Sequence, residues 1–156
     1  VVVQHIAAGF TDSFVEWMNE VTHKKVSIAS SGERLIASQV YVAPEGVQIE
    51  ITSNSVVRLC DSPARENWRP SVSYLFEQTA TEFGANAIGI LLSGMGKDGA
   101  EGLKKMKDAG ALTLIQDPET AMINGMPHAA FLLGAATEVL APTAIAKVIN
   151  SLKAKI

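Results

Sequence analysis

The second half of the chain alternates short, continuous apolar runs with stretches whose apolar residues recur every three or four positions. The apolar runs predict strands at 87–93, 112–116 and 137–140. The periodic stretches predict helices at 70–83, 101–109, 126–133 and 143–153, with Pro70 in the first turn of the first helix. Apolar strands that alternate with helices are typical of a parallel sheet covered on both faces.

The first half predicts three more strands, a helix and a hairpin. Strands are expected at 1–5, 25–29 and 39–43, and a helix at 12–22 with Thr11 as its N-cap. The apolar face of this helix would consist of Phe14, Trp17, Met18 and Val21. Residues 47–52 and 56–60 flank a polar turn and predict an antiparallel hairpin. Because no repeat or linker interrupts the pattern, residues 1–156 are interpreted as one α/β domain.

Composition narrows the class of protein. Of the 156 residues 47% are apolar and 19% are charged, and the net charge is −3, so the chain can bury a core and disorder is not expected. The pI of about 5.6 and the scattered Lys and Arg residues argue against a nucleic-acid-binding surface. No apolar run approaches the roughly 18 residues of a membrane-spanning helix, so membrane insertion is not expected.

Two features concern the setting and the extent of the chain. Cys60 is the only cysteine, so an intrachain disulfide framework is impossible and a reducing cytoplasm is the expected location. Residues 1–5 form a buried-strand pattern that starts at the first residue, so we expect natural sequence upstream of Val1.

A glycine-rich turn at 94–99 joins a predicted strand to a predicted helix, and it allows more than one interpretation. Its letters match G-x-G-x-x-G, and Asp117 follows about 20 residues later, as in dinucleotide-binding folds. Asp98 argues against that interpretation, because its carboxylate would compete with a pyrophosphate for the positive end of the helix. A tight structural turn with Asp98 as helix cap is a further alternative.

His5 is the other residue with suggestive chemistry, since it ends the first predicted strand. A single histidine is more often structural than catalytic. However, Asp98 also follows a predicted strand, and α/β sheets place their sites at the carboxyl ends of strands. An acid that holds an imidazole in one tautomer is half of a catalytic triad, which favours a hydrolase.

Several segments of the chain together carry a family resemblance. They are Gln4-His5 with Gly9-Phe10-Thr11 and Ser13-Phe14, Val40-Tyr41-Val42-Ala43-Pro44, Arg69-Pro70-Ser71-Val72 with Leu75-Phe76, Ser93-Gly94-Met95-Gly96-Lys97-Asp98-Gly99-Ala100, Gln116-Asp117, and Gly125-Met126-Pro127. In this order they resemble the chemotaxis protein-glutamate methylesterases (the CheB family), from Gln4 to about Leu140. The resemblance implies a doubly wound, mainly parallel, Rossmann-like three-layer α/β fold with an added antiparallel hairpin.

The resemblance also implies an activity and its residues. The family hydrolyses glutamyl methyl esters on chemoreceptors and releases methanol, and some members deamidate receptor glutamines. The family's triad histidine falls on His5 and its aspartate on Asp98, while Met95 and Gly96 fall on the turn beside the nucleophile, near the expected oxyanion site. Arg69 would either face the acidic receptor or lie in a solvated loop.

The expected partners are the cytoplasmic helices of methylated receptors and, in members that carry one, an N-terminal receiver domain that blocks the site until it is phosphorylated. No cofactor is implied. No metal is expected either, because His5, His23 and His128 lack the spacing of metal ligands.

The family's nucleophile is missing from the printed sequence. It is the serine of a G-x-S-T-G-G turn after the first strand of the sheet, and no G-x-S-x-G segment occurs here. We expect it upstream, within a strand, turn and helix of on the order of 30 residues. Ser71 is interpreted as a helix start and Ser93 as a structural residue. Trp68 stands where the family often has histidine. A non-catalytic relative that has lost the serine remains an alternative.

Overall fold

A computed structural model describes residues 1–65 and 67–152 of the chain. Its first part contains α1 (Thr11–Val21), β1 (Val26–Ile28), β2 (Val40–Val42), β3 (Gln48–Ile51) and β4 (Val57–Cys60). Its second part contains α2 (Val72–Phe83), β5 (Ile88–Leu91), α3 (Ala100–Asp108), β6 (Leu112–Gln116), α4 (Met126–Leu132), β7 (Glu138–Leu140) and α5 (Pro142–Ser151). Short 3-10 turns lie at Gly84–Asn86 and Pro118–Thr120.

The strands pair in three groups, of which two are parallel. The order β5-β6-β7 is parallel throughout, with Leu91 opposite Ile115 and Ile115 opposite Val139. Strands β1 and β2 also pair in parallel, and β3 and β4 form the predicted antiparallel hairpin. The mixed α/β class with parallel strands and one added hairpin is therefore confirmed.

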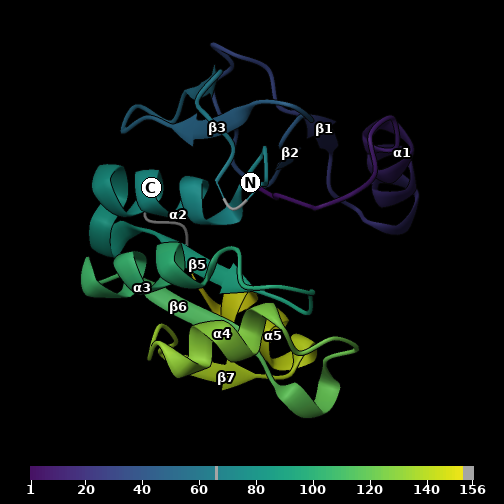
Figure 1. The fold of residues 1–156 in the computed structure, drawn as a ribbon. Coiled ribbons are helices and arrows are strands. Elements are labelled where there is room, and N and C mark those ends of the chain that lie inside the picture. Colours follow the sequence, from purple (N-terminus) through teal and green to yellow (C-terminus); the bar gives the residue numbers. More distant parts are fainter. Residues whose placement is uncertain (66, 153–156) are drawn as a thin grey trace.

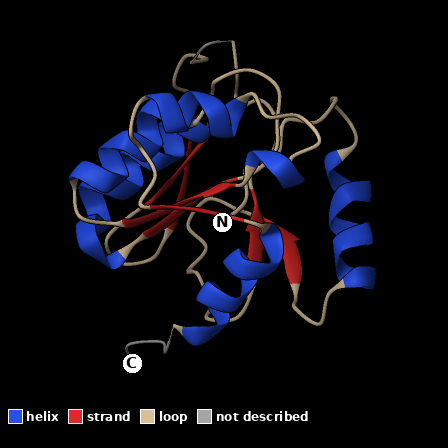
Figure 2. Cartoon of the chain, turned by 90° about the horizontal axis from the view of Figure 1, so that it is seen from below, coloured by secondary structure: helices blue, strands red, loops and turns tan. Residues whose placement is uncertain are grey.

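Helix α2 connects the two parts of the molecule. It lies in the middle of Figure 1, where it packs against β3 on one side and against α3 on the other. The contact with α3 is close, because a Cβ added to Gly102 would lie 2.5 Å from the carbonyl oxygen of Ser73. Figure 2 shows further helices on both sides of the strands, as expected for a sheet covered on both faces.

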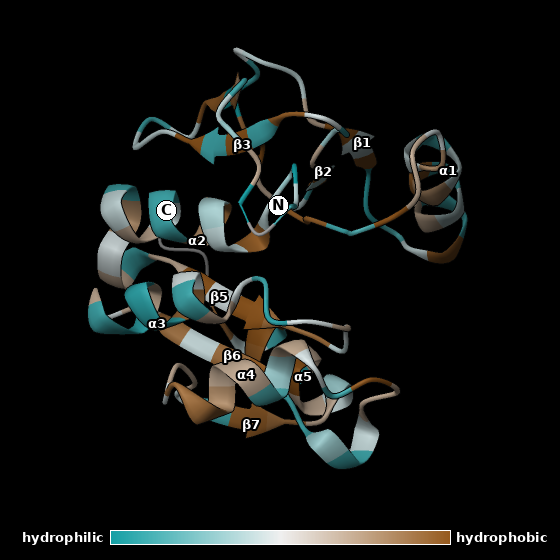
Figure 3. Ribbon diagram, in the orientation of Figure 1, coloured by the Kyte–Doolittle hydropathy of each residue, from teal (hydrophilic) through white to brown (hydrophobic). Residues whose placement is uncertain are grey.

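The apolar core has two clusters, and Figure 3 shows mainly apolar strands at β5, β6 and β7. One lies around α3 and β6 and includes Leu103 and Ile115, while the other lies around β2 and β3 and includes Tyr41 and Ile49. Val3 packs against both clusters, so the N-terminal segment lies between the two parts.

Two expectations for the N-terminal segment are wrong. Residues 1–5 do not form a regular strand. Val2 alone among them forms a β-bridge, and its partner is Val42 of β2. Thr11 is the first residue of α1, and Phe10 is the N-cap. The Thr11 hydroxyl donates to Glu45 at 2.6 Å, so it does not cap the helix.

Two further expectations, for α1 and α2, also need correction. Trp17 and Val21 of the expected apolar face of α1 are more than half exposed, because α1 packs mainly against β1 within the described part of the chain. Pro70 precedes α2 and does not belong to its first turn, because Ser71 is the N-cap. The end of the last expected helix, Lys153, lies outside the described residues.

Candidate active site

Asp98 follows β5 and precedes α3, in the glycine-rich turn. Gly96 and Gly99 have φ values of 92° and 94°, a conformation that glycine adopts without strain. Gly99 is also required sterically, since a Cβ there would lie 2.7 Å from side-chain atoms of Leu91 and Val72. The turn therefore brings Asp98 against the beginning of α2 rather than against its own helix.

The carboxylate of Asp98 occupies the N-terminal end of α2. Its Oδ1 accepts hydrogen bonds from the Ser71 hydroxyl at 2.8 Å and the Ser73 amide at 3.0 Å. Its Oδ2 accepts from the Val72 amide at 2.7 Å. These are amides that a helix leaves without intrahelical partners, and the positive end of the helix dipole favours an anion at this place. The alternative in which Asp98 caps the following helix, α3, is wrong, because Asp98 caps α2 and Gly99 is the N-cap of α3.

His5 completes the surroundings of this carboxylate. Its Nε2 lies 2.8 Å from Oδ2 of Asp98, although 93 positions separate the two residues in sequence. The side chain of Asp98 is 1% exposed and that of His5 is 14% exposed, so water competes little for the contact. The structure thus brings the two predicted site residues together.

The hydrogen bonds decide the charge of Asp98. Burial alone would raise the pKa of its carboxyl group, but the hydrogen bonds from His5, Ser73, Val72 and Ser71 outweigh it and lower the pKa from 3.8 to about 2. Asp98 is therefore an anion at neutral pH. An anionic carboxylate needs a donor, so Nε2 of His5 carries the proton, and Nδ1 is the nitrogen that can accept one.

A match to a family model shows the protein family to which the chain belongs. The model for the CheB methylesterase family matches residues 1–149. The chain belongs to the CheB methylesterase family.

Relatives and a solved structure agree with this. The chain is 47% identical to a protein-glutamate methylesterase/protein-glutamine glutaminase of Hahella chejuensis, over 97% of the chain and 43% of that protein. It is 45% identical to one of Geobacter metallireducens, over 97% of the chain and 44% of that protein. The chain thus spans less than half the length of these relatives.

The structure also matches the crystal structure of the Thermotoga maritima CheB methylesterase catalytic domain. The TM-score is 0.90 at 32% identity, and the match covers 97% of this chain and 82% of that one. This likeness confirms the predicted Rossmann-like class.

The glycine-rich turn at 94–99 carries the other residues predicted to lie near the site, Met95 and Gly96. Met95 is 80% exposed, so its side chain is available to a substrate or to another segment of protein. Gly94 anchors the turn, because its amide donates to Ile123 and its carbonyl accepts from Gly125 and Met126. These backbone hydrogen bonds therefore restrict the movement of the amides at Met95 and Gly96.

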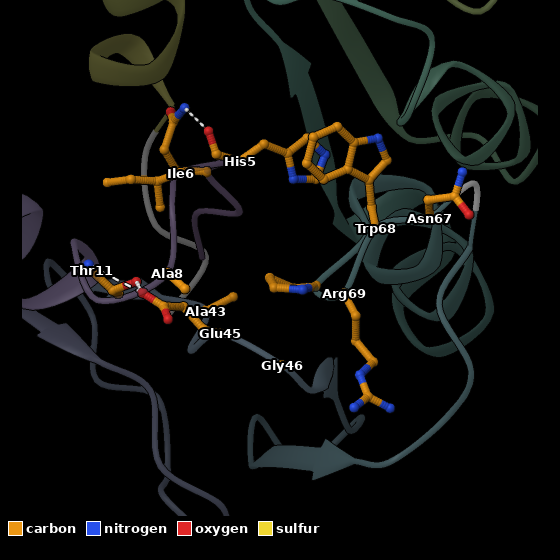
Figure 4. A pocket seen from close by; sticks show the side chains of 12 residues that line it. His5, Ile6, Ala8, Thr11, Ala43, Glu45, Gly46, Asn67, Trp68 and Arg69 are labelled. Carbon is orange, nitrogen blue, oxygen red and sulfur yellow. Dashed lines mark hydrogen bonds between the residues drawn. The ribbon is translucent and has the colours of Figure 1, made fainter.

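A pocket of about 210 Å³ opens beside His5. Figure 4 shows Trp68 and Arg69 along one side and Thr11 and Glu45 along the other. Glu45 accepts hydrogen bonds from Thr11 and Gly9, and these bonds lower the pKa of its carboxyl group. Arg69 lines the pocket and also donates to Asp61 at 2.8 Å, so it is partly committed to an ion pair.

Ser71 and Ser93 have the structural roles that the sequence predicted. Ser71 caps α2, accepting from the Tyr74 amide at 3.2 Å, and Ser93 bonds to the backbone of Ile123. The dinucleotide interpretation of the turn loses support, because the amide of Gly99 at the start of α3 donates to the Ser73 hydroxyl at 2.7 Å. Asp117 caps a 3-10 turn by accepting from Glu119.

Sequence reasoning missed two residues of the site. Trp68 stacks on the His5 ring, with centroids 3.8 Å apart and planes 13° from parallel. Gln48 is fully buried, and it accepts from the Ser71 amide at 2.9 Å and donates to the Trp68 carbonyl at 3.3 Å. The available signals were Trp68 at a position where the family often has histidine, and a glutamine within a predicted strand.

The described residues hold neither a cluster of potential metal ligands nor a helix that could span a membrane. In residues 1–65 and 67–152 no group of three or more His, Cys, Asp or Glu side chains could hold a metal ion. Within the same residues, no helix is long and apolar enough to cross a bilayer.

Proposed function

We propose that this chain is the larger part of a methylesterase catalytic domain that hydrolyses glutamyl methyl esters of proteins and releases methanol. The observation that carries the proposal is the buried contact of His5 with anionic Asp98, 2.8 Å long. The names of the relatives support the reaction, since those proteins are called protein-glutamate methylesterases and protein-glutamine glutaminases.

In the proposed mechanism a serine attacks the ester carbonyl while His5 takes its proton at Nδ1. His5 then returns that proton to the departing methoxy group, and water clears the acyl-enzyme. Asp98 keeps the proton on Nε2 and stabilises the imidazolium that forms. Four hydrogen bonds hold the Asp98 carboxylate, so its orientation need not change during the reaction.

The serine itself would come from a segment upstream of Val1. The open edge of β5 supports this placement, since among the described residues β5 pairs only with β6, and Ile88 and Leu92 are 41% and 48% exposed. A strand between β5 and the segment around Val3 would join the two parallel groups into one sheet. Its carboxyl end would then face His5, because parallel strands end at the same edge.

The developing oxyanion would be stabilised by backbone amides of the turn at Met95 and Gly96. One such donor typically contributes about 3–4 kcal/mol to the transition state. The turn suits this role because Gly94 ties it to the loop before α4.

We infer that the substrate is the cytoplasmic helices of methylated chemoreceptors, and that the protein acts in the cytoplasm. Arg69 lines the pocket beside His5 and would meet acidic groups of the receptor. Deamidation of receptor glutamines fits the same acyl chemistry and the relatives' second name. A receiver domain in the full-length protein would regulate access to the site.

Methanol release from methylated receptor membranes tests the proposal. The full-length protein, with any receiver domain removed or phosphorylated, should release methanol, and the His5→Ala variant should not. His128→Ala is a matched control, because His128 lies in α4, outside the pocket beside His5. Full-length protein without any release would identify a non-catalytic relative with the same fold.

A further inference from the structure

The indole of Trp68 covers one face of the His5 imidazole. The ring centroids are 3.8 Å apart and the planes are 13° from parallel, which is a stacked arrangement. Trp68 is 40% exposed, so its ring lies at the surface of the site and forms its outer wall. Figure 4 shows the two rings side by side at the edge of the pocket.

The position of Trp68 is set by its backbone. Its amide donates to the Arg65 carbonyl at 2.8 Å, and its carbonyl accepts from the Arg65 amide at 3.1 Å. The side chain of Arg65 is in turn ion-paired with Glu77 of α2. The paired backbones of Arg65 and Trp68 are therefore tied to a core helix, which limits the movement of the indole.

Gln48 connects this outer wall to the acid behind the base. Its amide donates to the Trp68 carbonyl at 3.3 Å, and its side-chain oxygen accepts from the Ser71 amide at 2.9 Å. Ser71 donates to Asp98, and Asp98 contacts His5. Trp68, Gln48, Ser71 and Asp98 are thus linked by hydrogen bonds, and Trp68 and Asp98 both contact the imidazole of His5.

From this geometry we propose that Trp68 is a positioning residue for His5, a role that rests on the esterase function proposed above. The stacked indole prevents the imidazole from turning away from Asp98, so Nδ1 stays directed at the nucleophile. The electron-rich face of the indole also stabilises the imidazolium that forms when His5 takes the serine proton. Both effects act in the transition state more than in substrate binding.

Kinetics of methanol release by the full-length protein test this role. Trp68→Leu keeps an apolar wall but removes the aromatic face, and it should lower kcat about tenfold with KM changed less than about twofold. Trp68→Phe keeps a stacking ring and should restore kcat to within about threefold of the wild type. Trp17→Leu is the matched control, since Trp17 is an exposed tryptophan of α1, and it should leave both constants unchanged.

NMR of ¹³C-histidine-labelled full-length protein gives a readout that needs no activity. The His5 ring protons should be shifted upfield by the indole ring current in the wild type and in Trp17→Leu. In Trp68→Leu that shift should vanish, and a second, exchanging orientation of the His5 ring should appear.

The possible outcomes separate the two proposals. Wild-type kcat in Trp68→Leu overturns the positioning role, and so does a rise in KM alone, which would make Trp68 a substrate contact. If the wild type releases no methanol, the esterase proposal fails by itself. The NMR then decides, because a single His5 orientation that survives Trp68→Leu refutes the role and an added orientation supports it.

Discussion

At the scale of single residues, the site depends on one buried carboxylate that serves two elements at once. Asp98 holds the proposed base, His5, and also satisfies the hydroxyl and amides at the beginning of α2. A structural carboxylate at a helix end and a catalytic one look the same in sequence. Here a single residue fills both roles, so its replacement should affect both stability and turnover.

Asp98→Asn should lower the turnover of methyl ester by roughly 10⁴-fold. The neutral amide cannot enforce the tautomer with the proton on Nε2, nor stabilise an imidazolium. Methanol release by the full-length protein measures the effect. Asp117→Asn is the control, since Asp117 caps only a 3-10 turn. Turnover near the wild-type value in Asp98→Asn would remove Asp98 from the mechanism.

The free energy of unfolding should depend on pH through the carboxyl group of Asp98. The pKa of Asp98 is lowered from 3.8 to about 2 on folding, so its ionised form favours the folded state. This contribution, about 2 kcal/mol, is complete above pH 4 and is lost as the pH falls through about 2.

Urea unfolding of wild type and Asp98→Asn at several pH values between 7 and 2 measures this contribution. The difference in free energy of unfolding between the two proteins should be largest near neutral pH and should shrink as the pH falls below about 4. A difference that stays constant with pH would show that ionisation of Asp98 does not contribute.

At the scale of elements, the beginning of α2 is the point on which the site is assembled. The helix carries Ser71, Val72 and Ser73 to one carboxylate, and its contact with α3 is close enough to require Gly102. The position of this helix therefore holds the Asp98 carboxylate that the glycine-rich turn brings to it. Building a site on rigid elements restricts the movement of its groups.

Ser71→Ala should destabilise the protein by about 1–2 kcal/mol. The change removes the cap of the Tyr74 amide and one of the four hydrogen bonds to Asp98. Thermal unfolding measures the loss, and Ser151→Ala, at the exposed end of α5, should have little effect. Equal melting temperatures for the two variants would contradict the importance given to this helix end.

At the scale of the whole molecule, the parallel strands form two groups with the N-terminal segment between them. Val3 touches both core clusters, while β5 has a free edge within the described residues. The arrangement supports the proposal that an upstream strand completes the sheet and carries the nucleophile to His5.

In the full-length protein Leu92 should therefore be buried. In a Cys60→Ala background, a cysteine introduced by Leu92→Cys should react with maleimide much more slowly in the full-length protein than in residues 1–156. A cysteine introduced by Met122→Cys is the control, because Met122 is 94% exposed, and it should react rapidly in both. Equal reactivity of Leu92→Cys in the two proteins would exclude a strand at this edge.

The sequence by itself determined the class of fold and the hairpin, and it predicted the two residues, His5 and Asp98, that the structure brings into contact. Continuous apolar runs at β5 and β6 and helical periodicity at α3 and α4 are local patterns, and local patterns are sufficient to predict such elements. His5 and Asp98 could be paired because both stand at the carboxyl ends of predicted apolar strands, and the carboxyl ends of parallel strands meet at one edge. The two residues are in contact although Val2 alone of the first predicted strand forms a bridge.

Only the tertiary structure decided which groups surround that pair. Asp98 caps α2 and not the helix that follows it, Trp68 stacks on His5, and Gln48 links the two. Each of these contacts joins residues at least 20 positions apart in the sequence. Such contacts depend on how the elements pack, and the spacing of apolar and polar residues within one element carries no information about its neighbour in space.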